Sequence, residues 1–160
     1  MYRKGNGVPA KLCFAGHVLM ENRHGLVVAA TVTEANGTAE RTASLDMLAR
    51  RPASHATVGV DNAYDTHDFI AQARALGVIP HVAQNDKRPG GSAIDGRTTR
   101  HPGYGLSQVI RKRIEEVFGW GKTVGPMRET HLKGLARVGF QMLLTIAGFN
   151  LIRMRNLIPV

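Results

Sequence analysis

Two adjacent carboxylates, Glu115 and Glu116, interrupt the basic segment RKRIEEVFGWGK, residues 111–122. If this segment is helical, Glu115 lies in one stripe with Arg111, four residues before it, and with Lys122, seven residues after it. The stripe borders an apolar one at positions 110, 114 and 117, so Glu115 would sit between core and solvent. A carboxylate there can reach water or a metal ion. The alternative is an exposed Arg111–Glu115 ion pair worth about 0.2–0.5 kcal/mol.

Asp61 is a second acid in a position suited to chemistry, because it directly follows the apolar stretch ATVGV, residues 56–60. That stretch predicts a short buried strand, and ligands of open α/β sheets bind beyond the carboxyl ends of strands. A strand-end Asp facing a helix-borne Glu could hold hard divalent cations through oxygen. Such ions support phosphoryl transfer. Asp61 could instead form a turn or cap a helix, although Asp65 is the better turn residue.

The charge of the chain points to a polyanionic partner. Its 160 residues carry a net charge of +9, which favours nucleic acid first and an anionic membrane surface second, with a basic surface kept for solubility as the alternative. Between residues 97 and 137, nine basic residues face three acidic ones. This segment suits phosphate contacts, and its candidates are Arg111, Lys122, Arg113, Lys112 and Arg100. A single cysteine excludes an internal disulfide and a cysteine-rich zinc site, and it fits a reducing cytosol.

Hydrophobic patterning predicts one α/β domain over residues 1–160 with a mixed sheet. The expected elements are a hairpin (10–20 and 25–33), a helix capped by Thr38 (39–51), a strand (56–64), a helix between Thr66 and Gly77, a strand (78–84), and two helices (106–122, capped by Ser107, and 134–155). A basic loop at about 85–105 separates the last strand from these helices. The apolar run 138–152 is shorter than the roughly 20 residues of a spanning helix, so we expect a buried core helix and no membrane.

Four segments resemble the DDE transposases of bacterial insertion elements, specifically the insertion sequence five group. They are KLCFAGHVLMENRHGLVVAATVTEANGTAER, GVDNAYDTHDFIAQARALGVIPHVAQN, SAIDGRTTRHPGYGLSQVIRKRIEEVFGWGKTVG and GLARVGFQMLLTIAGFNLIR, in the same order as in that family. The resemblance implies an RNase H-like catalytic domain with two Asp and one Glu as ligands of Mg²⁺ or Mn²⁺. It also implies that the chain binds element ends and target DNA in the bacterial cytoplasm, associated with the nucleoid.

Within this resemblance, Asp61 stands at the second Asp, and Arg111, Glu115 and Lys122 match the end of a Tyr-x2-Arg-x3-Glu-x6-Lys signature. Gln108 replaces its Tyr. In relatives, the first Asp lies on a strand upstream of the segment resembling YRKGNGVPAKLCF, and no acid precedes Glu21 here.

We therefore expect a truncated, C-terminal part of the catalytic domain that lacks the first central strand. The sheet would then have a gap, or the hairpin would close onto the Asp61 strand. With two ligands of three, Mg²⁺ or Mn²⁺ would bind weakly and the chain alone would show little or no strand transfer. The alternative is a non-catalytic DNA-binding or dimerising remnant, and a homo-oligomer is a further expectation.

Overall fold

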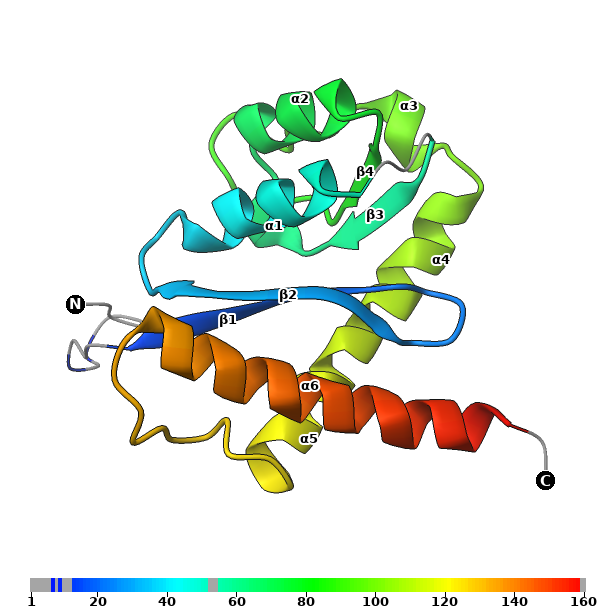
Figure 1. The fold of residues 1–160 in the computed structure, drawn as a ribbon. Coiled ribbons are helices and arrows are strands. Elements are labelled where there is room, and N and C mark those ends of the chain that lie inside the picture. Colours follow the sequence, from blue (N-terminus) through cyan, green and yellow to red (C-terminus); the bar gives the residue numbers. More distant parts are fainter. Residues whose placement is uncertain (1–6, 8, 10–12, 52–54, 159–160) are drawn as a thin grey trace. The chain divides into compact units, whose positions relative to one another are not determined.

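The structure is a computed structural model, and it describes residues 13–51 and 55–158 together with residues 7 and 9 (Figure 1). The chain divides into two compact units, one made of residues 1–44 and 113–160 and the other of residues 45–112. Each unit has its own small sheet and its own hydrophobic cluster. The boundary at residue 44 falls inside helix α1 (Ala39–Ala49). The side chain of Asn36 accepts the N–H groups of Thr38 and Ala39, at 2.9 and 2.6 Å, at the start of α1, and the predicted cap by Thr38 stays a prediction.

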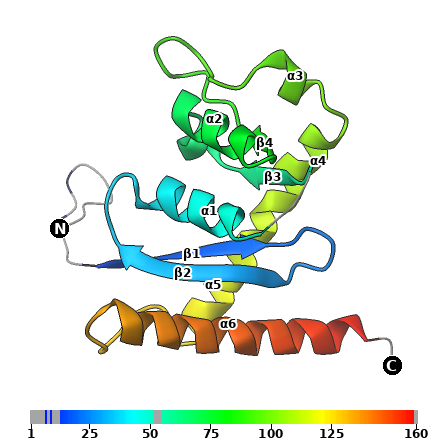
Figure 2. The ribbon, with the colours of Figure 1, turned by 45° about the horizontal axis from the view of Figure 1, so that its top comes forward.

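The first unit is built on the hairpin β1 (Phe14–Met20) and β2 (Val27–Glu34), whose strands pair antiparallel from Phe14↔Glu34 to Met20↔Val27. Helix α6 (Leu135–Leu157) runs beside this hairpin (Figure 2). The amide of Asn150 fixes the helix to the strand, because it donates to the carbonyl of Val27 and accepts its N–H, each at 2.9 Å. Helix α5 (Ile114–Thr123) packs on α6, and Val117 joins the core beneath it.

Helix α6 differs from the expected core helix in length and in burial. Its 23 residues extend the apolar run at both ends, and by length and composition alone such a helix could cross a membrane. The face toward the hairpin is buried through Val138, Met142, Ile146 and Phe149. On the other side Phe140, Leu144 and Leu151 are exposed to 63%, 58% and 68%. Only one face of α6 is therefore core.

The second unit pairs β3 (Thr57–Val60) with β4 (Ile79–Val82) in parallel, with Val60 opposite Val82. Helix α2 (His67–Ala75) connects them and buries Phe69, Ile70 and Ala73. Thr66 caps α2 as predicted, accepting the Phe69 N–H at 3.3 Å, and Gly77 follows the helix with a φ of +74°. A 3₁₀ turn, η1 (Asn62–Tyr64), links β3 to α2.

The helix expected over residues 106–122 is broken into three pieces, namely α4 (Gly103–Ile110), the 3₁₀ turn η2 (Arg111–Arg113) and α5. The predicted cap at Ser107 is wrong, because this residue lies inside α4 and is buried. The expected basic loop also contains a short helix, α3 (Gly96–Thr99), which Asp95 caps by accepting the Thr98 N–H. The apolar periodicity of 106–122 continues across η2, and for this reason the break was not predicted.

The described strands form two separate two-stranded sheets and not the single mixed sheet predicted from the sequence. The α/β class is confirmed, with small sheets flanked by helices. Within the described part of the chain β1 and β2 pair only with each other, and the missing central strand stays a prediction.

Candidate functional site

Asp61 lies at the carboxyl end of β3, as predicted, and its side chain is exposed. Its Oδ1 accepts the N–H of Ala63 at 2.8 Å, so the same carboxylate also caps the turn η1. The strand-end position and the capping alternative are therefore both present. The cap fixes the orientation of the carboxylate at the sheet edge.

The carboxyl end of β4 lies at this same edge, because the two strands are parallel and Ala83 donates its N–H to the carbonyl of Val60 at 3.0 Å. Tyr104 of α4 reaches the edge as well, where its hydroxyl donates to the carbonyl of Val82 at 2.8 Å. Burial raises the pKa of this phenol. Tyr104 lies one helical turn before Gln108, which stands at the Tyr position of the Tyr-x2-Arg-x3-Glu-x6-Lys signature. A tyrosine this close to that position could have identified Tyr104 from the sequence as a residue of the candidate site.

Gln108 holds Arg111. Its amide nitrogen donates to the carbonyl of His81 at 2.7 Å, and its amide oxygen accepts the Nε–H of Arg111 at 2.9 Å. Gly59 of β3 makes room for this arrangement, because a Cβ there would lie 3.2 Å from the Ser107 carbonyl and 3.3 Å from the Arg111 Cβ. A half-buried, oriented guanidinium near the end of β3 is suited to a phosphate.

A buried polar pair, His81 of β4 and Ser107 of α4, joins the strand to the helix. His81 is fully buried, and its Nδ1 lies 2.7 Å from the hydroxyl of Ser107. Burial lowers the pKa of His81, and the neighbouring His101, with its ring centroid 5.0 Å away, lowers it further. Both effects favour the neutral form of the imidazole. In the described part of the chain its Nε2 has no hydrogen-bond partner.

The other predicted acid belongs to the first unit. Glu115 is exposed in the first turn of α5, beside Glu116, whose carboxylate lies 3.8 Å from the guanidinium of Arg153. No salt bridge among the described residues involves Glu115. Lys122 is exposed in the last turn of α5, and Arg113 is exposed and donates to the carbonyl of Asn22 at 3.3 Å.

The two remaining basic candidates belong to the second unit. Arg100 is exposed and donates its Nε–H to the Gly96 carbonyl at 3.0 Å, while Lys112 is exposed in the middle of η2. The site residues thus divide between the units, with Asp61, Arg100, Arg111 and Lys112 in one and Glu115, Arg113 and Lys122 in the other. The pairing of Asp61 with Glu115 stays a prediction.

The donor chemistry of a metal site is met in part. The carboxylates of Asp61 and Glu115 are the hard oxygen donors that Mg²⁺ and Mn²⁺ prefer, and both are exposed. However, the described residues contain no group of three or more His, Cys, Asp or Glu side chains that could hold a metal ion. The type of donor atom therefore suits Mg²⁺ or Mn²⁺, but the described residues supply too few clustered ligands for a complete site.

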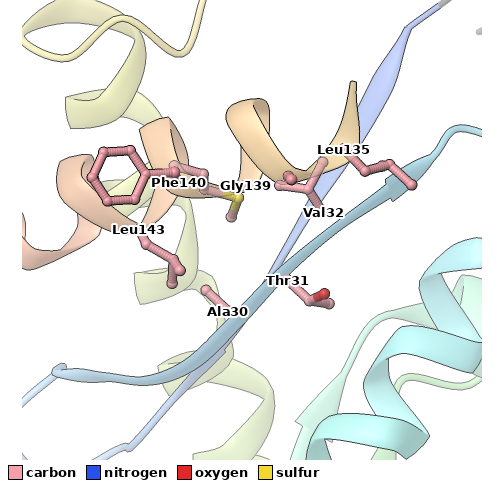
Figure 3. Close-up of a pocket in the computed structure, with 9 residues that line it drawn as sticks. Ala30, Thr31, Val32, Leu135, Gly139, Phe140 and Leu143 are labelled. Atoms are coloured by element: carbon pink, nitrogen blue, oxygen red, sulfur yellow. The ribbon is translucent and has the colours of Figure 1, made fainter. Parts of the chain in front are cut away.

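An apolar groove lies between β2 and α6, with a volume of about 440 Å³ (Figure 3). Its walls include Val32 from the strand and Leu135, Phe140 and Leu143 from the helix. No acidic or basic residue lines it, so it is unsuited to a metal ion or a phosphate. None of the acidic and basic candidate residues described above lines this groove.

A family model described as transposase DDE domain matches residues 2–151 of the chain. The match includes every acidic and basic candidate named above. No match to the chain was found among curated proteins or among solved structures.

Proposed function

The chain belongs to the transposase DDE domain family, and we propose that it takes part in DNA transposition as a catalytic-domain chain of the insertion sequence five group. The family carries out transposition-type DNA cleavage and strand transfer, binds DNA and generally uses divalent metal ions. The observation that carries the proposal is the family match across residues 2–151, joined to an acid at the carboxyl end of a parallel strand.

Within this function, Asp61 and Glu115 serve as carboxylate ligands in an RNase H-like domain. Mg²⁺ or Mn²⁺ bound there would supply charge neutralisation and activation of the attacking oxygen. Arg111, oriented by Gln108, holds a DNA phosphate, and Lys122, Arg113, Lys112 and Arg100 add cationic contacts. Gln108 replaces the signature tyrosine by positioning Arg111. With DNA as its partner, we expect the protein in the bacterial cytoplasm, associated with the nucleoid.

The number of acids limits what residues 1–160 can do alone. The resemblance assigns two of the three catalytic carboxylates, Asp61 and Glu115, to this sequence. Mg²⁺ normally needs several well-placed oxygen ligands, so two carboxylates bind it weakly. We therefore expect the chain by itself to bind DNA but to show little or no strand transfer.

A cleavage assay on DNA carrying the element ends, with Mg²⁺ or Mn²⁺, tests these assignments. The purified chain should bind the DNA without cutting it. If it cuts and Asp61→Ala abolishes the cutting, the assignment of Asp61 is supported and the expected inactivity of the chain alone is wrong. If it cuts equally well with Asp61→Ala, the assignment of Asp61 is wrong.

A second candidate function, a non-catalytic dimerising protein that binds DNA, is favoured by the exposed face of α6. Phe140, Leu144, Ala147, Leu151 and Met154 follow one another at spacings of four and three, which is the seam spacing of paired helices. No charged residue lies between positions 138 and 152. Two copies of a chain with a net charge of +9 can therefore meet along the part of this face between positions 138 and 152 without opposing like charges.

Light scattering after size-exclusion chromatography tests the proposed homo-oligomer. The chain should elute as a dimer, and Leu144→Glu should convert it to a monomer because it places a charge in the seam. Thr123→Glu, on the exposed end of α5, is the matched control and should leave the dimer intact. A monomeric chain would rule out this second candidate.

A further inference from the structure

Asp65 carries a buried carboxylate whose hydrogen bonds lead to one distant loop. The residue is 1% exposed. Its Oδ2 accepts the N–H of Asn85 at 2.8 Å, and its Oδ1 accepts the N–H of Ala93 at 2.9 Å. Arg88, between these two residues, donates to the backbone carbonyl of Asp65 at 2.9 Å. The three bonds tie both ends and the middle of the loop 85–93 to a single residue.

This role differs from the turn residue that the sequence predicts for Asp65. The local turn is closed by backbone bonds, such as the one from the Asp65 N–H to the Asn62 carbonyl at 3.2 Å, and by the caps Asp61 and Thr66. A buried charge is costly unless it is well hydrogen-bonded. The carboxylate of Asp65 is hydrogen-bonded by the loop, so the loop accounts for an acid at this position.

The base of the loop lies at the sheet edge that carries Asp61. Asp65 follows Asp61 across the short turn η1, and Asn85 follows Val82, the last residue of β4. Because Val60 and Val82 are paired in register, both connections leave the same edge. The bonds to Asp65 therefore fix the loop beside the candidate catalytic acid.

The outer part of the loop is exposed and carries two cations. Residues 86–91 are all exposed, and they include Lys87 and Arg88. Gly90 and Gly91 have φ values of +89° and +76°, a left-handed conformation that turns the chain sharply. Asp86 lowers the net charge of the loop to +1, so any attraction for an anion depends on how Lys87 and Arg88 are oriented.

We propose that Asp65 is a positioning residue that holds the loop 85–93 at the edge bearing Asp61, so that Lys87 and Arg88 contact the phosphate backbone of bound DNA. The proposal rests on the proposed function for its partner, DNA. An anchored loop loses less conformational freedom on binding than a free one, which favours the contact. Phosphate contacts of this kind position the duplex without reading its sequence.

Fluorescence anisotropy with a labelled duplex of arbitrary sequence, titrated at several salt concentrations, tests the role of Asp65. Asp65→Asn removes one negative charge, and by charge alone it should strengthen DNA binding. We expect weaker binding, by about threefold to tenfold, and a plot of log Kd against log salt concentration that is shallower by about 1–2. Asp68→Asn, an exposed acid in the first turn of α2, is the control with the same charge change and should bind DNA as well as the unsubstituted chain or better.

Lys87→Gln in both backgrounds separates the loop from a general loss of structure. It should weaken binding in the unsubstituted chain and change little in Asp65→Asn, where the loop is already released. If circular dichroism shows that Asp65→Asn does not fold, the double variant Lys87→Gln, Arg88→Gln decides, with an expected loss of about 2 from the salt slope.

An unchanged slope in that variant, or in a folded Asp65→Asn, overturns the proposal. If the unsubstituted chain binds no DNA, the proposed function fails as well, whereas unaltered binding by the loop variants refutes only the role of Asp65.

Discussion

Gly59 of β3 lies in close contact with the Ser107 backbone of α4, and its replacement by alanine should destabilise the second unit. The new Cβ would lie 3.2 Å from the carbonyl oxygen of Ser107 and 3.3 Å from the Cβ of Arg111. Neither atom is the end of a flexible side chain, so the helix itself must shift. Overpacking of this kind costs about 1–3 kcal/mol. The reduced freedom of the unfolded chain returns about 0.4–1 kcal/mol, so the middle of each range leaves a net loss of about 1.3 kcal/mol.

Urea denaturation followed by circular dichroism measures this loss, and Gly105→Ala is the matched control. Gly105 lies in α4, where an added Cβ meets nothing within 4 Å. Alanine there should stabilise the chain by about 0.5–1 kcal/mol, since glycine inside a helix is unfavourable. The two substitutions are thus expected to shift the denaturation midpoint in opposite directions. A Gly59→Ala chain as stable as the unsubstituted one would refute the close packing of α4 on β3.

The remaining predictions concern two buried polar side chains. Burial, together with His101, lowers the pKa of His81 from 6.5, so its contribution to stability is complete above pH 6.5 and is lost as the pH falls below it. His81→Gln should reduce the slope of the free energy of unfolding against pH by up to about 1.4 kcal/mol per pH unit, as measured by urea denaturation at several pH values. A slope unchanged by the substitution would contradict this. Asn150→Ala leaves the N–H and carbonyl of Val27 without the amide and should lower the free energy of unfolding by about 1–3 kcal/mol, whereas a loss below about 0.5 kcal/mol would show that this amide does not fasten α6 to the hairpin.

Local signals in the sequence predicted the parts of the fold that local interactions determine. Thr66 and Gly77 bracket α2 because a capping oxygen and a left-handed glycine act within one turn of their helix. The position of Asp61 was also predictable, since an apolar run followed by an acid marks the carboxyl end of a strand. The break at Arg111–Arg113 was not, because the apolar spacing continues through it.

Long-range contacts determined what the sequence did not reveal. The bonds of Asp65 to Asn85 and Ala93 join residues at least 20 positions apart, and no local pattern records them. The pair of His81 and Ser107 is hidden in the same way, because each residue alone is typical of a surface loop or a helix start. The exposed half of α6 was missed because an apolar sequence does not state which of its faces is covered.

The central claim is that Asp61 and Glu115, far apart in the chain, are ligands of one divalent cation. Iron-directed cleavage of the polypeptide measures this, since Fe²⁺ bound in place of Mg²⁺ generates radicals, with ascorbate and peroxide, that cut the backbone beside the ion. We predict cuts close to both residues that excess Mg²⁺ suppresses and that Asp61→Asn or Glu115→Gln each abolishes at both places. Cuts near one acid that persist when the other is replaced, or cuts at neither, would contradict the claim.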